Sequence, residues 1–230
     1  MGKTIVVVGF GTGISTAVAE KFGSAGFSVA LVARGEERLS AGVAALKAKG
    51  IQAAAFLADA GDSAAIRAAV GKARAALGPI TVVHWNASGG GQAGDLTSAD
   101  AGAIRGVFEV AVVGLLAAVQ EALPDLKKTK DGAVLITNGA FGELSPQMDE
   151  YAVHSKAMGL ALANATKHKL AGLLAQRLKS DGVYVGEVMV AGTIKGTAWD
   201  QGSANVEAST VANKFWELYQ ARSETRARVS

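Results

Sequence analysis

Three glycines and one arginine near the N-terminus carry the first chemical signal in this sequence. The glycines lie in the segment Gly9-Phe10-Gly11-Thr12-Gly13-Ile14-Ser15, and Arg34 ends the next apolar run. Glycines let backbone N–H groups approach a pyrophosphate, and a helix that begins there presents the positive end of its dipole to it. A guanidinium at the end of this second apolar run suits the 2′-phosphate of NADP(H). An acidic side chain at the same place would instead bind the ribose 2′-hydroxyl of NAD(H). The pattern therefore predicts a site for NADP(H) in preference to NAD(H).

The hydrophobic pattern predicts the elements that must position these residues. Apolar runs predict strands at 4–8, 28–33, 52–57, 80–85, 132–137 and 183–190. Helical spacing predicts helices near 14–24, 36–49, 62–76 and 99–126, within 148–180, and at 207–221. Alternation of this kind favours a parallel sheet covered by helices on both faces. We predict an α/β, Rossmann-like doubly wound parallel sheet with strand order 3-2-1-4-5-6, in a single domain spanning residues 1–230.

Composition narrows the class of protein further. Half of the 230 residues are hydrophobic, which is enough for a sizeable core, and the net charge of +3 is too small and dispersed to indicate nucleic acid. The absence of cysteine excludes disulfides, thiolate zinc sites and a cysteine nucleophile, and three scattered histidines indicate no metal site. The sequence enters a strand at once, and we expect no apolar run near the roughly 20 residues of a membrane span. These features lead us to expect a cytoplasmic protein without a membrane partner.

Five segments make the chain resemble the short-chain dehydrogenase/reductase family over nearly its whole length. The loop Gly9–Ser15 resembles that family's cofactor loop, with serine at its third glycine, and Ala33-Arg34 resembles its NADP-type strand ending. Asp59 follows the third strand, Asn86-Ala87 resembles the stretch after the fourth, and residues 191–197 resemble the loop that covers the nicotinamide. The resemblance implies these cofactor-binding residues: Gly9, Gly11, Thr12, Gly13, Ile14, Arg34, Asp59, Ala60, Asn86, Ala87, Ser88, Lys156, Gly192 and Ile194.

The family's catalytic residues are less well matched in this sequence than its cofactor-binding residues. The family uses an asparagine, a serine and a tyrosine, together with a lysine four residues after the tyrosine. If Lys156 takes the lysine position, the other three positions hold Ala111, Gly139 and Ala152. Tyr151 then lies five residues before Lys156, which on a regular helix turns it about 100° away from the required direction.

A second alignment stays open, in which Lys167 takes the lysine position and Ala163 the tyrosine position. Neither alignment keeps the tyrosine. We retain Lys156 and Tyr151 as the candidate catalytic residues, with His154, Ser155, Asn138 and His84 as the polar side chains that remain as substitutes.

Two functions therefore stay open. The first is an NADP(H)-dependent oxidoreductase acting on a small carbonyl or alcohol that no motif identifies. The second is a non-catalytic NADP(H)-binding sensor or regulatory subunit.

The helix around residues 107–119 is apolar nearly all round, which predicts burial on more than one side, in the core or by another subunit. The family resemblance implies a homodimer or homotetramer, and it leaves residues 226–229 as a short substitute for a seventh strand.

Overall fold

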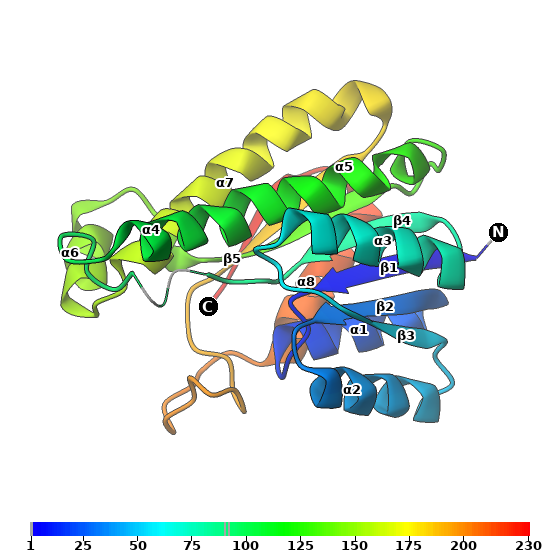
Figure 1. Cartoon of the computed structure of the whole chain (residues 1–230), viewed down its shortest axis with the longest axis horizontal. Coiled ribbons are helices and arrows are strands. Elements are labelled where there is room, and N and C mark those ends of the chain that lie inside the picture. Colours follow the sequence, from blue (N-terminus) through cyan, green and yellow to red (C-terminus); the bar gives the residue numbers. More distant parts are fainter. Residues whose placement is uncertain (1, 90, 92) are drawn as a thin grey trace.

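A parallel sheet of seven strands runs through the middle of the molecule, in the order β3-β2-β1-β4-β5-β6-β7 (Figure 1). The computed structural model describes residues 2–89, 91 and 93–230. The strands are β1 (Lys3–Val8), β2 (Phe27–Ala33), β3 (Ala53–Leu57), β4 (Ile80–Trp85), β5 (Ala133–Gly139), β6 (Tyr184–Val190) and β7 (Arg226–Val229). The predicted order of the first six strands is confirmed, and the C-terminal segment adds the seventh. The order reverses between β1 and β4, and a crevice forms at such a point in open α/β sheets.

Helices cover both faces of the sheet, because alternate residues of each buried strand point to opposite faces. One face packs on α1 (Ile14–Ser24), α2 (Glu36–Ala48) and α8 (Ala208–Ala221) through a core that includes Val7, Phe22 and Phe215. The other face packs on α3 (Ser63–Leu77), α5 (Leu115–Leu126) and α7 (Met158–Leu178) through a core that includes Val6 and Trp85. The α/β doubly wound architecture is therefore confirmed.

One long helical segment spans residues 101–126, as predicted for 99–126. It consists of α4 (Ala101–Phe108), a π-helical turn η1 (Glu109–Gly114) and α5. This segment of 26 residues has a mean hydropathy of 1.9 over its most apolar 18-residue window, so the expectation that no apolar run approaches membrane length was wrong. The same composition suits a core helix, and 39% of that window is buried by the rest of the chain. Its Phe108 and Val113 side chains stay 38% exposed.

The long helix predicted within 148–180 is present as α7, and a second, shorter helix precedes it. α6 (Pro146–His154) ends before a break at Lys156, whose φ of +50° is left-handed, and α7 begins at Met158. The N–H groups of Met158 and Gly159 donate to the carbonyls of Gly94 and Ala93, at 3.1 and 2.8 Å. Hydrogen bonds to a segment remote in sequence thus replace those that would have continued α6. As a result α6 projects at one end of the molecule (Figure 1).

Candidate functional site

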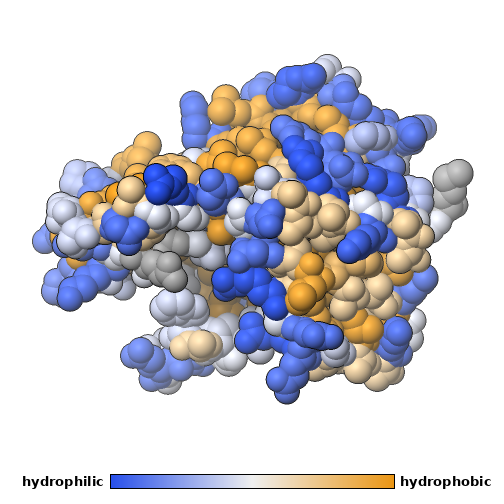
Figure 2. Space-filling model, viewed as in Figure 1, coloured by the Kyte–Doolittle hydropathy of each residue, from blue (hydrophilic) through white to orange (hydrophobic). Residues whose placement is uncertain are grey.

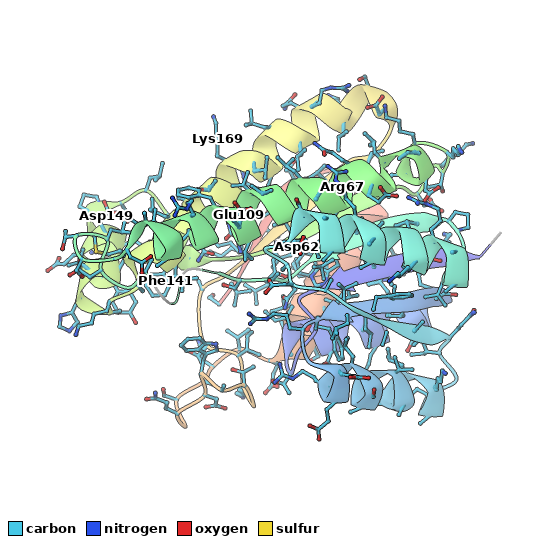
Figure 3. All side chains as sticks on the ribbon, in the orientation of Figure 1. Asp62, Arg67, Glu109, Phe141, Asp149 and Lys169 are labelled. Carbon is cyan, nitrogen blue, oxygen red and sulfur yellow. The ribbon has the colours of Figure 1, made fainter. Side chains whose placement is uncertain are left out.

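A cavity of about 1490 Å³ opens at the carboxyl ends of β1, β2 and β4, where the strand order reverses. Eight of the predicted cofactor-binding residues line it: Gly9, Gly11, Arg34, Asp59, Ala60, Asn86, Ala87 and Ser88. Asp62 at the start of α3 and Glu109 on the long helix line it as well, and Figure 3 shows both. The sequence thus identified the floor of the cavity through the residues that follow consecutive strands.

Gly9 makes the floor of this cavity possible. Its φ is +82°, and a Cβ at this position would overlap the backbone nitrogen of Ala87. The Asn86 side-chain amide donates to the Gly9 carbonyl at 3.2 Å, and the N–H of Gly9 donates to the carbonyl of Val32 at 2.9 Å. The turn after β1 is therefore fixed to the ends of both neighbouring strands.

The start of α1 fits an anionic group. The helix has no side-chain cap, and its first turn holds no acidic residue, so its N–H groups are free of a carboxylate competitor. Ser15, at the family's third glycine position, is fully buried, and its hydroxyl donates to the carbonyl of Gly11 and accepts from the N–H of Gly11, both at 2.9 Å. The serine therefore closes the turn from inside without occupying the cavity.

The remaining predicted cofactor-binding residues lie around this turn. Thr12 lines a smaller neighbouring cavity of about 230 Å³, and Ile14 packs against the core. Gly13 has a φ of +93°, and a Cβ on it would lie 3.3 Å from the Cγ2 atom of Ile194, so the loop after β6 reaches the glycine turn. Gly192 lies in that loop, where a Cβ would lie 2.5 Å from Asn205 Oδ1.

Two arginines border the outer end of the cavity. The Arg34 side chain is 79% exposed, and its Nη1 atom lies 3.7 Å from Oδ2 of Asp59. Arg38, in the first turn of α2, also lines the cavity, and its Nη1 atom would lie 3.8 Å from a Cβ on Gly11. Arg38 was not among the residues that the sequence analysis singled out.

These observations agree with a comparison to known protein families. A family model described as short chain dehydrogenase matches residues 3–202. The chain belongs to the short-chain dehydrogenase family.

Curated relatives within the short-chain dehydrogenases match the chain at moderate identity. A short-chain dehydrogenase of Pseudocercospora fijiensis is 33% identical over 160 residues, covering 68% of this chain and 52% of the relative. The 2,3-dihydro-2,3-dihydroxybenzoate dehydrogenase of Bacillus subtilis is 30% identical over 170 residues, covering 70% of this chain and 65% of the relative. The chain thus spans between half and two thirds of the length of these relatives.

Solved short-chain dehydrogenase structures share the fold at lower identity. One from Burkholderia cenocepacia in complex with NADP has a TM-score of 0.87 and 24% identity, covering 100% of this chain and 97% of that one. A short chain oxidoreductase of Pseudomonas aeruginosa, NADPH-bound and described as having an atypical catalytic center, has a TM-score of 0.85 and 20% identity, with coverage of 99% and 95%.

The positions that the sequence analysis aligned with the family's asparagine, serine and tyrosine hold no side chain that can donate a proton. Ala111 lies buried in the π-helical turn, and Ala152 lies buried in α6. A Cβ on Gly139 would lie 2.7 Å from Nδ2 of Asn164, so this amide fills the space beside the end of β5. Tyr151 is 56% exposed, and its ring stacks on Phe141, with 5.4 Å between ring centroids.

The two candidate lysines lie in different environments. Lys156 is exposed at the break between α6 and α7. Lys167 is buried in α7, and its amine donates to the carbonyl of Thr137 at 3.2 Å. Burial lowers the pKa of the Lys167 amine to about 8, although the charge of Glu187 acts in the opposite direction. Among the described residues, Leu160 lines the cavity from α7, whereas neither Lys156 nor Lys167 lines it.

The polar side chains considered as substitute donors also lie in two environments. His154 and Ser155 are exposed at the end of α6. Asn138 is buried and donates to Oε1 of Glu187 at 2.6 Å and to the carbonyl of Asn164 at 2.9 Å. His84 is fully buried, 3.0 Å from the Thr137 hydroxyl, and burial lowers its pKa to about 3.

Glu187 is the centre of a buried polar cluster that the sequence did not reveal. Its side chain is 1% exposed in β6. Besides Asn138, it contacts His168 of α7, with 2.9 Å between Nδ1 and Oε2, and Arg226 of β7, with 3.3 Å between Nε and Oε2. The cluster therefore joins β5, β6, β7 and α7, and the ion pair between Arg226 and Glu187 adds to the backbone pairing of β7 with β6.

Proposed function

We propose that the chain is an NADP(H)-dependent oxidoreductase that acts on a small carbonyl or alcohol. The main observation in support is the cavity at the strand ends, with the uncapped start of α1 at one side and two arginines at its rim. Similar structures of short-chain dehydrogenases or oxidoreductases were solved with NADP or NADPH, which agrees with this choice of cofactor.

The residues of this chain suggest how the cofactor would be held. The N–H groups at the start of α1 would bind the pyrophosphate, Arg34 would bind the 2′-phosphate, and Asp59 would contact the adenine. Gly192 and Ile194 belong to the loop that covers the nicotinamide, which supplies or accepts a hydride when it is bound. The chain itself has to orient the carbonyl and provide a proton to its oxygen.

We assign the proton donor to Lys156 ahead of Tyr151. Lys156 lies at the break just before α7, the helix that lines the cavity through Leu160. Tyr151 is instead held by its stack on Phe141 at the exposed end of the molecule, where Figure 3 shows Phe141 beside α6. A lysine is a less effective general acid toward a carbonyl oxygen than a tyrosine whose pKa is lowered by a neighbouring cation. We therefore expect slow turnover.

Turnover with a panel of small aldehydes, ketones and diketones, followed by NADPH oxidation, tests this assignment. We expect Lys156→Met to lower kcat by about 10²- to 10⁴-fold, the usual effect of losing a positioned acid, and calorimetry on the same variant separates this loss from any weaker binding of NADPH. Tyr151→Phe is the matched control and should retain activity. Loss of turnover in Tyr151→Phe with an active Lys156→Met variant would contradict the assignment.

A second function is favoured by Ala111, Gly139 and Ala152, none of which can donate a proton. In this alternative, the chain binds NADP(H) without chemistry, as a redox sensor or a regulatory subunit. NADPH binding in calorimetry, together with no turnover on any carbonyl or alcohol of the panel, would favour it over the oxidoreductase. Turnover that depends on Lys156 would exclude it.

A further inference from the structure

The C-terminal strand β7 contacts the segments that follow two other strands of the sheet. The guanidinium of Arg228 forms an ion pair with the carboxylate of Glu143, which lies between β5 and α6. The carbonyl of Val229 accepts from the N–H of Ala191, the first residue after β6, at 2.8 Å. Two consecutive residues of β7 therefore bind the segment after β5 and the segment after β6 at the same time.

The loop after β6 connects this contact to the glycine turn. The two arms of the loop are joined, because the N–H of Lys195 donates to the carbonyl of Val206 at 3.0 Å. Ile194 and Val206 are buried in the same core cluster as Val229 of β7. A Cβ on Gly13 would lie 3.3 Å from the Cγ2 atom of Ile194. The loop therefore extends from a base on β7 to the start of α1.

An arginine at the beginning of β7 fixes the strand to the sheet. Arg226 pairs with the buried carboxylate of Glu187, and its Nη2 atom donates to the carbonyl of His168 in α7 at 3.1 Å. Loss of this arginine would leave a buried charge with less compensation, which is costly. Arg226 and Arg228 are two residues apart in a strand, so both point to the face of the sheet that α7 covers. The strand is thus a firm base from which Arg228 reaches Glu143.

We propose that β7 is a clamp that fixes the segments after β5 and β6 relative to each other for binding of the nicotinamide half of the cofactor, with Arg228 as a positioning residue. The segment after β5 starts from Gly139, and the segment after β6 contains Gly192 and Ile194 of the loop assigned to the nicotinamide. Arg228 acts through Glu143 and the segment that carries it. This inference rests on the proposed function, since it concerns the same cofactor site.

Calorimetry with NADPH and with adenosine 2′,5′-bisphosphate tests the proposal without any need for turnover, because only NADPH contains the nicotinamide. Arg228→Glu sets two carboxylates against each other and should raise the Kd for NADPH by about three- to tenfold. The Kd for the bisphosphate should stay within about twofold. Arg228→Gln removes the charge without repulsion and should give a smaller change in the same direction, whereas Arg228→Lys keeps the charge and should stay close to the native protein.

A charge exchange distinguishes positioning from a general loss of stability. Arg228→Glu combined with Glu143→Arg restores the ion pair in the opposite sense and should return the Kd for NADPH to within about twofold of the native value. Arg177→Glu is the matched control, since it breaks an exposed ion pair with Asp181 in the last turn of α7, and it should change neither Kd.

The outcomes separate this inference from the proposed function. If Arg228→Glu weakens both ligands equally or weakens neither, or if the charge exchange brings no recovery, the inference about the clamp is wrong and the proposed function stands. If the native protein binds neither NADPH nor the bisphosphate, the proposed function itself is wrong.

Discussion

At the scale of single residues, His84 shows how a polar group in the core links stability to pH. Its imidazole is fully buried on β4, its Nε2 atom lies 3.0 Å from the Thr137 hydroxyl, and its ring edge packs on Phe215. Its Nδ1 atom has no partner within the part of the chain that the structure describes. The ring is therefore held neutral, and burial lowers its pKa from 6.5 to about 3.

In mild acid, His84 binds a proton in the unfolded chain but not in the folded chain. We therefore expect the folded protein to lose stability as the pH falls. Between pH 6.5 and 3 the unfolded chain binds a proton that the folded chain does not, so stability is complete above pH 6.5 and falls below it. The contribution is at most about 1.4 kcal/mol per pH unit. Urea unfolding at pH 7.5, 6.0 and 5.0 should show a shallower fall for His84→Gln than for the native protein. His154→Gln, at an exposed position, serves as control, and equal slopes in all three proteins would refute the argument.

The residue scale also shows how far the sequence could predict the site. The floor residues Gly9, Asp59 and Asn86 could be predicted because each follows an apolar strand, and strand ends of a parallel sheet meet at one edge. Arg38 could not be singled out, because an arginine in the first turn of a helix most often faces solvent. The burial of Lys167 and Glu187 was hidden as well, since their pairing depends on the packing of α7 on β6.

At the scale of elements, the break between α6 and α7 could not be predicted from local pattern. The residues on both sides of Lys156 suit a helix, and the hydrogen bonds that separate the two helices come from Ala93 and Gly94, far away in the sequence. The strands and α1, by contrast, follow from apolar runs and the glycine turn alone. Local periodicity therefore predicted the layers, whereas tertiary contacts determine where Lys156 lies.

The π-helical turn η1 supports the cavity through the close approach of Gly114 to the chain after β3. A Cβ on Gly114 would overlap the carbonyl oxygen of Ala60, a residue that lines the cavity. Gly114→Ala should therefore destabilise the protein by about 1–3 kcal/mol, the usual cost of overpacking, and weaken nucleotide binding. Thermal and urea unfolding measure the first effect, and calorimetry measures the second.

Gly106→Ala is the control for this prediction, because a Cβ on Gly106 meets no atom within 4 Å in the same long helix. It should stabilise the protein by about 0.5–1 kcal/mol through the higher helix propensity of alanine. If the two variants shift the free energy of unfolding equally, the close packing at Gly114 does not matter.

At the scale of the whole molecule, the long helix has more apolar surface than one chain covers. It lies between α3 and α7 (Figure 1), while Phe108 and Val113 stay 38% exposed, and Leu173 of α7 is 55% exposed. Figure 2 shows apolar side chains over α5 and α7 among charged ones. An apolar face that extends across two helices is what a subunit interface requires. We propose that two copies of the chain pair through the long helix and α7, which agrees with the dimer or tetramer that the family resemblance implies.

Sedimentation velocity over a range of protein concentrations tests this assembly. The native protein should sediment as a dimer or tetramer, and Val113→Glu combined with Leu173→Glu should give a monomer, because each buried and unpaired carboxylate opposes association. Leu144→Glu is the control, since Leu144 is 92% exposed in the segment before α6 and lies outside the proposed interface. The monomeric variant should still bind NADPH, because the cavity is lined by residues of one chain. A native protein that stays monomeric at high concentration would contradict the proposed pairing through the long helix and α7.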